Sequence, residues 1–444
     1  MIKIRSKNRN LKNELGNKNL SIHKVPPNKF RKKKRKHEFY TIVAISIILG
    51  SIILFYYYIK EPFHLTDETV INITFDDDIN HEEFIYGTFQ LDDKEDRKCV
   101  EKMDCRIKIK GSEEERGSRR WPKKNYRIEL SKAKALLGMR RDDDWDLYAL
   151  YMDYTRLRIK LGFDLWGSLK ETNPTAITPN SKYVVLYLNG EFHGLYLLAE
   201  RSDRKLYGLD DAQNNKDSSL IFQSMGNTEL RCNASDRWEQ DWPNEYEGCY
   251  IKELIIPDLI SFINNTPDEV FFSESDGIYT IFDKLNLIDF FVYNYFILHK
   301  DFWRNNFYIV RNTNPSKFFL IPWDYDDSFG QVMHNRYSSQ ENYIEFIERN
   351  NELFNRLVNN DLFMKECKNR WVYLRENLWT EGFILNILFE DFDELENAIK
   401  ADTEMWNPKE IKERWDNDFK ESLDDLLQWI PNRLEYCDSF FYNF

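Results

Sequence analysis

The sequence predicts an α+β fold, with an N-terminal mainly β lobe and a C-terminal mainly helical lobe, preceded by one transmembrane helix. Between residues 70 and 200, short segments alternate apolar and polar side chains, as half-buried strands do. Beyond Tyr343, apolar residues recur at helical spacing. Residues 39–59 contain no charged side chain. The chain has 444 residues, which suits one large domain or two ordinary ones.

The N-terminal segment is basic and precedes the uncharged run. Its first 38 residues contain 14 Lys or Arg against two Glu. About 20 helical residues cover the roughly 30 Å hydrocarbon layer of a bilayer. A cleaved signal peptide has a shorter apolar region, and the aromatic residues 55–58 favour a membrane interface over a cleavage site. The positive-inside rule then predicts a single-pass membrane protein that contacts the lipid bilayer through residues 39–59, with a cytoplasmic N-terminus and an extracytoplasmic C-terminal domain.

The rest of the chain is acidic. It carries 48 basic and 73 acidic residues, a net charge of about −25, against −13 for the whole chain. Nucleic-acid binding requires a surplus of Lys and Arg, so we expect no nucleic-acid partner. An acidic surface suits a basic substrate or a divalent cation, and it equally suits plain solvation. All six cysteines lie in this part, and Cys99 with Cys105 and Cys232 with Cys249 are close enough to close local loops as disulfides.

The acidic part begins with strands. Alternation predicts them at residues 70–75, 84–91, 106–110 and 124–130. The loop over residues 111–120 contains Gly111, Gly117 and Arg119 and is suited to cover a polyphosphate, although a solvated hairpin tip explains it equally well.

The middle of the chain continues with a helix and a hairpin. An amphipathic helix is predicted to end near Leu169. Residues 183–188 and 192–198 form a predicted β-hairpin, because Asn189-Gly190 is the strongest short-range turn signal. Glu200 follows this hairpin directly.

The last part of the chain is mostly helical. Residues 214–250 are polar and are interpreted as an insertion, and an apolar helix over residues 285–298 follows them. Helical periodicity then predicts a C-terminal layer of helices, at residues 352–358, 362–378, 383–400 and 418–434.

A polar hairpin between these helices predicts a metal site. Its strands and turn are expected at residues 307–310, 318–321 and 312–316. Its open end would bring Asp301 and Asn306 close to Asp324 and Asp326. Such residues taken one at a time are more often turn residues, but carboxylates and an amide oxygen gathered together are ligands for Mg²⁺ or Mn²⁺.

The spacing of this set matches that of protein kinases. Asp301, Asn306 and Asp324 stand in the order of a catalytic Asp, a metal-binding Asn and the metal-binding Asp of D-F-G. His299-Lys300 replaces the usual His-Arg, and Asp324–Gly330 replaces D-F-G.

The chain resembles the CotH family, the spore coat protein H-like atypical kinases, in five strings: PKKNYRIEL (122–130), DYTRLR (153–158), VVLYLNGEFHGLYLLAE (184–200), DFWRNNFY (301–308) and PWDYDDSFG (322–330). The resemblance covers roughly residues 70–400. It implies an atypical protein-kinase-like fold and, in active members, transfer of the γ-phosphate of ATP to Ser or Thr of secreted or surface proteins and to themselves. Fungal relatives are also surface invasins.

The resemblance implies roles on both sides of a nucleotide. Lys124 would neutralise the α- and β-phosphates, with Lys123 and Arg119 as further nucleotide-binding candidates, and Glu200 would pair with the lysine.

On the metal side, the resemblance implies that Asp301 orients the substrate hydroxyl or holds metal. Asn306 would bind a second metal ion, and Asp324 would bridge metal to the β- and γ-phosphates with help from Asp326. Arg158 would hold a structural or phosphate-binding place.

The expected organisation is a basic cytoplasmic arm (1–38), a transmembrane helix (39–59), a linker (60–69), a CotH kinase-like domain (70–400) and a C-terminal helical extension (401–444). The expected function is that of a membrane-anchored, extracytoplasmic Ser/Thr protein kinase using ATP with Mg²⁺ or Mn²⁺, its partners being a protein with a Ser or Thr acceptor, ATP and the bilayer. A non-catalytic surface-binding protein or adhesin with the same fold is the alternative, and a transferase that adenylylates its substrate also fits the residues.

Overall fold

The computed structural model of the chain describes residues 68–93, 100–112, 117–226, 228–231, 235–244, 250–332, 335–406 and 419–443. The chain divides into two compact units, Met1–His64 and Leu65–Phe444. The described residues all belong to the second unit, and the predicted basic arm lies outside them.

The predicted localisation in the membrane is corrected. In the part of the chain that the structure describes, no helix has the length and apolarity needed to cross a bilayer. The long helix α10 (Glu381–Trp406), for example, contains eight acidic residues. The segment 39–59, to which the span and the bilayer contact were assigned, lies outside the described residues. The single-pass localisation is therefore withdrawn.

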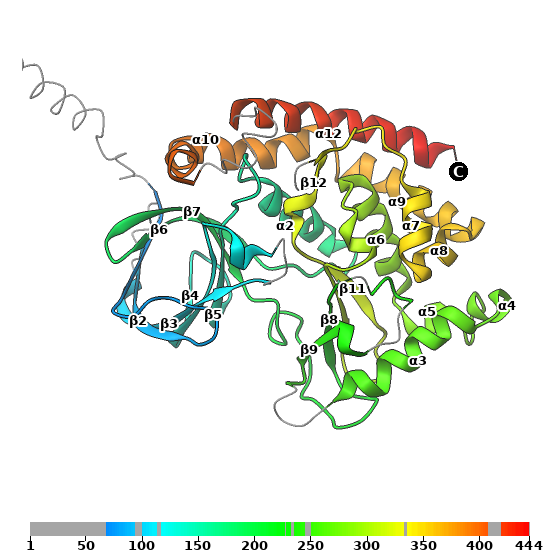
Figure 1. Ribbon diagram of the computed structural model, residues 1–444. Coiled ribbons are helices and arrows are strands. Elements are labelled where there is room, and N and C mark those ends of the chain that lie inside the picture. The colour runs from blue at the N-terminus through cyan, green and yellow to red at the C-terminus, as the bar shows by residue number, and fades with distance from the viewer. Residues whose placement is uncertain are drawn as a thin grey trace, which may run out of the picture. The chain divides into compact units, whose positions relative to one another are not determined.

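The N-terminal lobe is a closed β-barrel (Figure 1), with strands in the order β1 (Val70–Phe75), β2 (Ile85–Asp92), β3 (Val100–Lys110), β4 (Asn125–Ala135), β5 (Arg141–Tyr148), β7 (Glu191–Glu200) and β6 (Ser181–Leu188). Neighbours are antiparallel except β1 and β6, which run parallel and close the barrel. Alternate side chains such as Ile107, Ile128 and Trp145 fill its interior. The predicted strands and the predicted hairpin of β6 and β7 are confirmed.

A second sheet contains the hairpin that carries the candidate metal ligands. Its strand order is β11 (Phe319–Pro322), β10 (Phe307–Arg311), β8 (Leu220–Ser224) and β9 (Trp238–Trp242). The interpretation of residues 214–250 as a polar insertion was incomplete, because this segment supplies β8 and β9. Each has only five residues, and β9 reads Trp-Glu-Gln-Asp-Trp, so neither gives a clear strand pattern.

Helices form the C-terminal part, as predicted. The longer ones are α2 (Arg158–Gly167), α3 (Ile251–Asn265), α6 (Lys284–Ile297), α7 (Ile344–Asn350), α8 (Glu352–Val358), α9 (Asp361–Asn377), α10 and α12 (Phe419–Tyr442); α4 (Asp268–Phe271) and α5 (Ile278–Ile281) are single turns. Every residue of α6 from Asn286 to Ile297 is buried, and the helix packs against α9, α12 and β11 (Figure 1). The α+β prediction is thus confirmed for the described residues.

The cysteines of the described part form no disulfide bond. Cys105, Cys367 and Cys437 are free and buried. The structure therefore does not show the loop closure between Cys99 and Cys105 that the sequence allows. Cys99 itself, like both cysteines of the other predicted pair, lies outside the described residues.

Gly162 on α2 lets the segment after β11 pack against this helix. A Cβ atom at Gly162 would lie 2.3 Å from Cγ of the buried Tyr325 ring. Gly162→Ala should therefore lower the free energy of unfolding by about 1–3 kcal/mol, measured by urea denaturation. Gly382→Ala is the matched control, because a Cβ at this helical glycine meets no atom within 4 Å. Equal stability of the two variants would contradict the close packing.

Candidate functional site

The hairpin of β10 and β11 has the predicted form. Phe307 pairs with Pro322, and the Trp323 N–H donates to the Asn306 carbonyl at 3.1 Å, just beyond that pair. Asn306 and Asp324 therefore lie at its open end, as the sequence predicts.

The backbone at both positions is left-handed. Asn306 has a φ of 58° and Asp324 a φ of 67°. Asn and Asp tolerate this region better than most residues do. His299 fixes the second position: its Nε2 lies 2.8 Å from the Asp324 carbonyl, and its ring stacks on Phe302 with centroids 3.6 Å apart. Burial lowers the pKa of His299 to about 4, so the ring is neutral and its Nε2–H donates to that carbonyl.

The carboxylates near the hairpin's open end repel one another. Burial raises the pKa of Asp324 to about 6, against the opposing effect of Lys110, and Asp301 raises it further. The pKa of Asp326 is also raised well above its usual range. Burial is the largest cause, and the negative charges of Asp324, Asp327 and Asp301 raise this pKa further. A divalent cation relieves such repulsion, and the donors are all oxygen atoms. The donor atoms are therefore of the type that Mg²⁺ and Mn²⁺ prefer, but among the described residues it is Asp142, Asp143 and Asp144, not Asp301, Asp324 and Asp326, whose carboxylates lie within 4.8 Å of one another, so the metal site remains a prediction.

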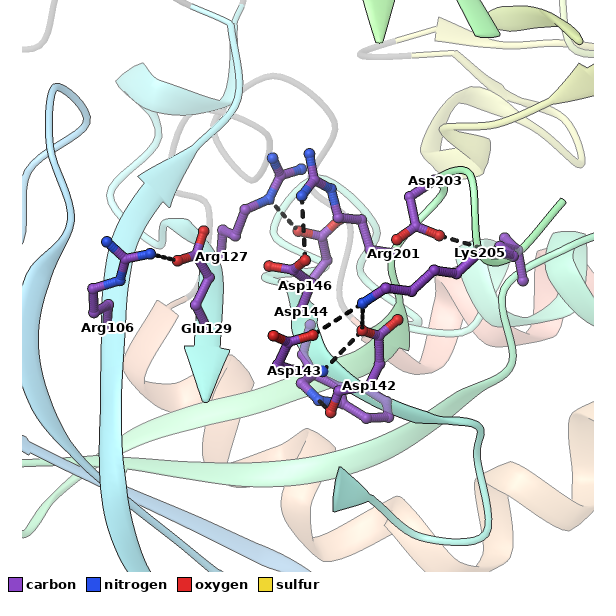
Figure 2. A network of polar contacts seen from close by, with 12 residues as sticks. Arg106, Arg127, Glu129, Asp142, Asp143, Asp144, Asp146, Arg201, Asp203 and Lys205 are labelled. Carbon is purple, nitrogen blue, oxygen red and sulfur yellow. Dashed lines mark hydrogen bonds and ion pairs between the residues drawn. The ribbon is translucent and has the colours of Figure 1, made fainter. Parts of the chain in front are cut away.

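Cations of the barrel face this group. Strand pairing aligns Lys108, Arg127 and Asp146 across the outer face of β3, β4 and β5. The buried carboxylate of Asp146 receives Lys110 Nζ at 2.5 Å and Arg127 Nε at 3.1 Å, the latter visible in Figure 2. The charge of Lys110 also lowers the pKa of Asp324, which links this ion-paired cluster electrostatically to the candidate metal ligands.

Sequence reasoning missed the cluster of Lys110, Arg127 and Asp146. The alternation Arg-Ile-Lys-Ile-Lys from residue 106 to residue 110 already placed the basic side chains on one face of a strand. The alternation did not indicate that this face also meets Asp146, because Asp146 lies on another strand, 36 residues after Lys110.

The predicted nucleotide-binding lysines already have partners within the protein. Lys124 donates to the carbonyl of Arg119 at 2.6 Å, across the turn that precedes β4. Lys123 is fully buried and donates to Asp402 at 2.6 Å and to the carbonyl of Leu195 at 2.5 Å. Both lysines are therefore engaged at the base of the loop between β3 and β4.

Glu200 has backbone partners instead of a lysine. Its carboxylate accepts hydrogen bonds from the N–H of Arg140 at 2.7 Å and from the N–H of Asn180 at 3.0 Å. Among the described residues the structure therefore does not pair Glu200 with Lys124 or Lys123, and the catalytic roles of these three residues remain predictions.

Arg158 links the barrel side to the segment after β11. It is buried, its Nη1 lies 2.5 Å from Oδ1 of Asp153, and its Nε donates to the Ser328 carbonyl at 3.2 Å. These contacts are those of a structural residue, which is one of the two roles, structural or phosphate-binding, that the family resemblance implies for Arg158.

A separate acidic cluster already has its cations. Within the described residues, Asp142, Asp143 and Asp144 bring carboxylate oxygens within 4.8 Å of one another. Lys205 Nζ contacts the first two at 2.6 and 3.0 Å (Figure 2), and Arg140 lies 2.8 Å from Asp142. These ion pairs explain the cluster without a metal ion.

Asp146 should make the fold sensitive to acid. Burial alone would raise its pKa, but Arg127 and Lys110 together hold it well below the ordinary value. A carboxylate with a lowered pKa in the folded state contributes stability above its unfolded pKa, near 3.9, and that contribution is lost as the pH falls further. Asp146→Asn should therefore be less stable at pH 7 and lose less stability than the wild type between pH 5 and pH 3, measured by urea denaturation. Parallel pH curves for the two proteins would contradict this.

Known proteins match over this same region. The family model described as CotH kinase protein matches residues 107–437, a range that contains every residue discussed above as a candidate ligand or nucleotide contact. The inner spore coat protein H of Bacillus subtilis (strain 168) is 24% identical over 347 residues, which cover 76% of this chain and 86% of that relative.

Proposed function

Because the chain belongs to the CotH kinase family, we propose that it is an ATP-dependent protein kinase with an atypical kinase-like fold, which transfers the γ-phosphate of ATP to Ser or Thr of proteins and to itself. The observation that carries the proposal is the position of Asn306 and Asp324 at the open end of one hairpin, with Asp301 close enough to raise the pKa of Asp324. Lys110, on the barrel strand β3, lowers the pKa of Asp324.

The protein's own residues supply positioning and charge. Asp324 and Asn306, with Asp326, would hold Mg²⁺ or Mn²⁺, which neutralises charge between the β- and γ-phosphates when bound. Asp301 orients the acceptor hydroxyl and accepts its proton as the new phosphate ester bond forms and ADP leaves. Phosphoryl transfer depends mainly on such positioning and electrostatic stabilisation, so no nucleophile on the enzyme is required.

On the barrel side, we assign phosphate neutralisation to Lys110 and Arg127. Asp146 keeps both cations charged and oriented, as the glutamate of a kinase lysine–glutamate pair does. Lys124, which the family resemblance favours, is the competing candidate.

The test uses the full-length protein with Mg²⁺ or Mn²⁺ and ATP labelled at the γ- or the α-phosphate. Transfer of γ-label to the protein or to a general acceptor, together with a metal-dependent rise in melting temperature on adding ATP, is the expected result. Transfer of α-label instead would indicate adenylylation. No transfer and no thermal shift would favour the non-catalytic binding protein, which has no need of a metal site.

A further inference from the structure

A buried carboxylate on α10 joins the barrel to the rest of the fold. Asp402 lies near the C-terminal end of α10 and has no exposed surface. Its Oδ1 accepts from Lys123 Nζ at 2.6 Å and from the Leu195 N–H at 2.8 Å, and its Oδ2 accepts from Arg156 Nε at 2.7 Å. Three charged side chains are thus buried together, and removing one of them leaves the others without compensation.

One branch from Asp402 leads to the loop between β3 and β4. Lys123 ends that loop, directly before Lys124 and β4, the strand that carries Arg127. Gly194 on β7 leaves room for the carboxylate: its φ is 117°, and a Cβ there would lie 2.3 Å from Oδ1 of Asp402. The close approach of α10 to the barrel is therefore built into the backbone of β7.

The other branch leads to the segment after β11. Arg156 also donates to the carbonyl of Asp153, whose side chain accepts from Arg158 at 2.5 Å, and Arg158 in turn donates to the Ser328 carbonyl at 3.2 Å. Gln331 donates to the carbonyl of Met152 at 2.8 Å. The turn over residues 152–158 therefore touches Asp402 on one side and the segment 328–331 on the other.

We propose that Asp402 is a positioning residue for phosphoryl transfer, which holds the base of the β3–β4 loop and the segment that follows Asp324 in register with each other. This inference rests on the proposed function. One branch reaches the start of β4 and the other the segment after Asp324, and the buried hydrogen bonds that Lys123, Arg156 and Arg158 make in them are charge-assisted, which makes them shorter and stronger than neutral ones. A shift of about 1 Å between such groups lowers a rate by about a hundredfold.

The kinetic test compares Asp402→Asn with Asp289→Asn. Asp289 is a matched control, because it is equally buried and pairs with Arg370 at 2.6 Å, while its partners Arg370 and Asn173 belong to neither branch. Both variants should melt at lower temperature. Well below either melting temperature, only Asp402→Asn should raise the KM for ATP and lower kcat, with kcat/KM reduced about 10- to 100-fold. A change in melting temperature alone, as in the control, would overturn the positioning role.

A second measurement does not depend on activity. Amide hydrogen exchange should become faster in both residues 117–126 and residues 324–331 of Asp402→Asn, and in neither segment of Asp289→Asn. Lys123→Met keeps the Arg156 pair and tests the coupling if Asp402→Asn does not fold. It should also speed exchange in residues 324–331, which Lys123 does not contact in the described structure. Exchange that changes only beside Lys123 would refute the coupling, even in a protein that transfers no phosphate.

Discussion

Asp324→Ala is expected to abolish γ-phosphate transfer, with a loss in kcat of about a thousandfold or more. The Asp324 carboxylate is one of several that repel one another, and a divalent cation would relieve this repulsion. His299 holds the backbone of Asp324 in place through its carbonyl. No neighbouring residue can supply the missing oxygen from the same backbone position. Transfer is measured with γ-labelled ATP at saturating Mg²⁺ or Mn²⁺.

The isosteric variant Asp324→Asn should not be destabilised in the absence of metal. A carboxylate whose pKa is raised by burial and by Asp301 costs stability at neutral pH, and Asn tolerates the left-handed backbone at this position, so Asp324→Asn should melt at or above the wild-type temperature in EDTA. Asp324→Asn and Asp324→Ala should both lose the rise in melting temperature that metal and ATP give the wild type. Asp258→Ala, which removes an exposed ion pair with Lys216, is the surface control and should transfer phosphate normally. Residual transfer by Asp324→Ala within tenfold of the wild-type rate would remove Asp324 from the proposed site.

Lys110→Met should lower kcat/KM for ATP about a hundredfold, and Lys124→Met by much less. Lys110 shares the carboxylate of Asp146 with Arg127 and acts on Asp324, whereas Lys124 donates to a backbone carbonyl of its own turn. Initial rates at varied ATP concentration measure both variants. The reverse order of effects would return the phosphate-neutralising role to Lys124.

A double variant separates lost charge from lost stability. In Lys110→Met, Asp146 loses one of its two cationic partners and keeps Arg127. Part of a fall in kcat/KM would then come from distortion of this barrel face and not from the lost charge itself. Lys110→Met combined with Asp146→Asn balances the charge again. It should recover melting temperature relative to Lys110→Met and should not recover kcat/KM.

The parts of the site that the sequence predicts are those with local signals. The turn at residues 312–316, the alternation of the flanking strands and the polar residues at their ends all lie within about thirty positions of one another. Pairing across such a short loop follows from turn chemistry, and it brings Asn306 and Asp324 to the same end. Local alternation likewise predicted six strands of the barrel, but it missed β5 (Arg141–Tyr148).

The parts that sequence reasoning missed depend on contacts between distant segments. Lys123 and Asp402 are 279 positions apart, and no periodicity in either segment points to the other. The pairing of β8 with β10 likewise joins five-residue strands more than 80 positions apart. The lysine–glutamate pair that the family resemblance implies is not formed among the described residues, for a simpler reason. The Glu200 carboxylate accepts hydrogen bonds from two backbone N–H groups that would otherwise be left unpaired.

The parallel pairing of β1 with β6 has a consequence for how the chain folds. It joins residues 70–73 to residues 185–188, so the barrel closes only after more than a hundred intervening residues have been made and ordered. Contacts of such high sequence separation carry a large loop-closure entropy and slow the folding of a domain. Until β6 arrives during synthesis, β1 presents an open edge that can pair with another chain. Early folding intermediates of this protein are therefore the species most exposed to aggregation, and a chaperone that covers β1 would act at this step.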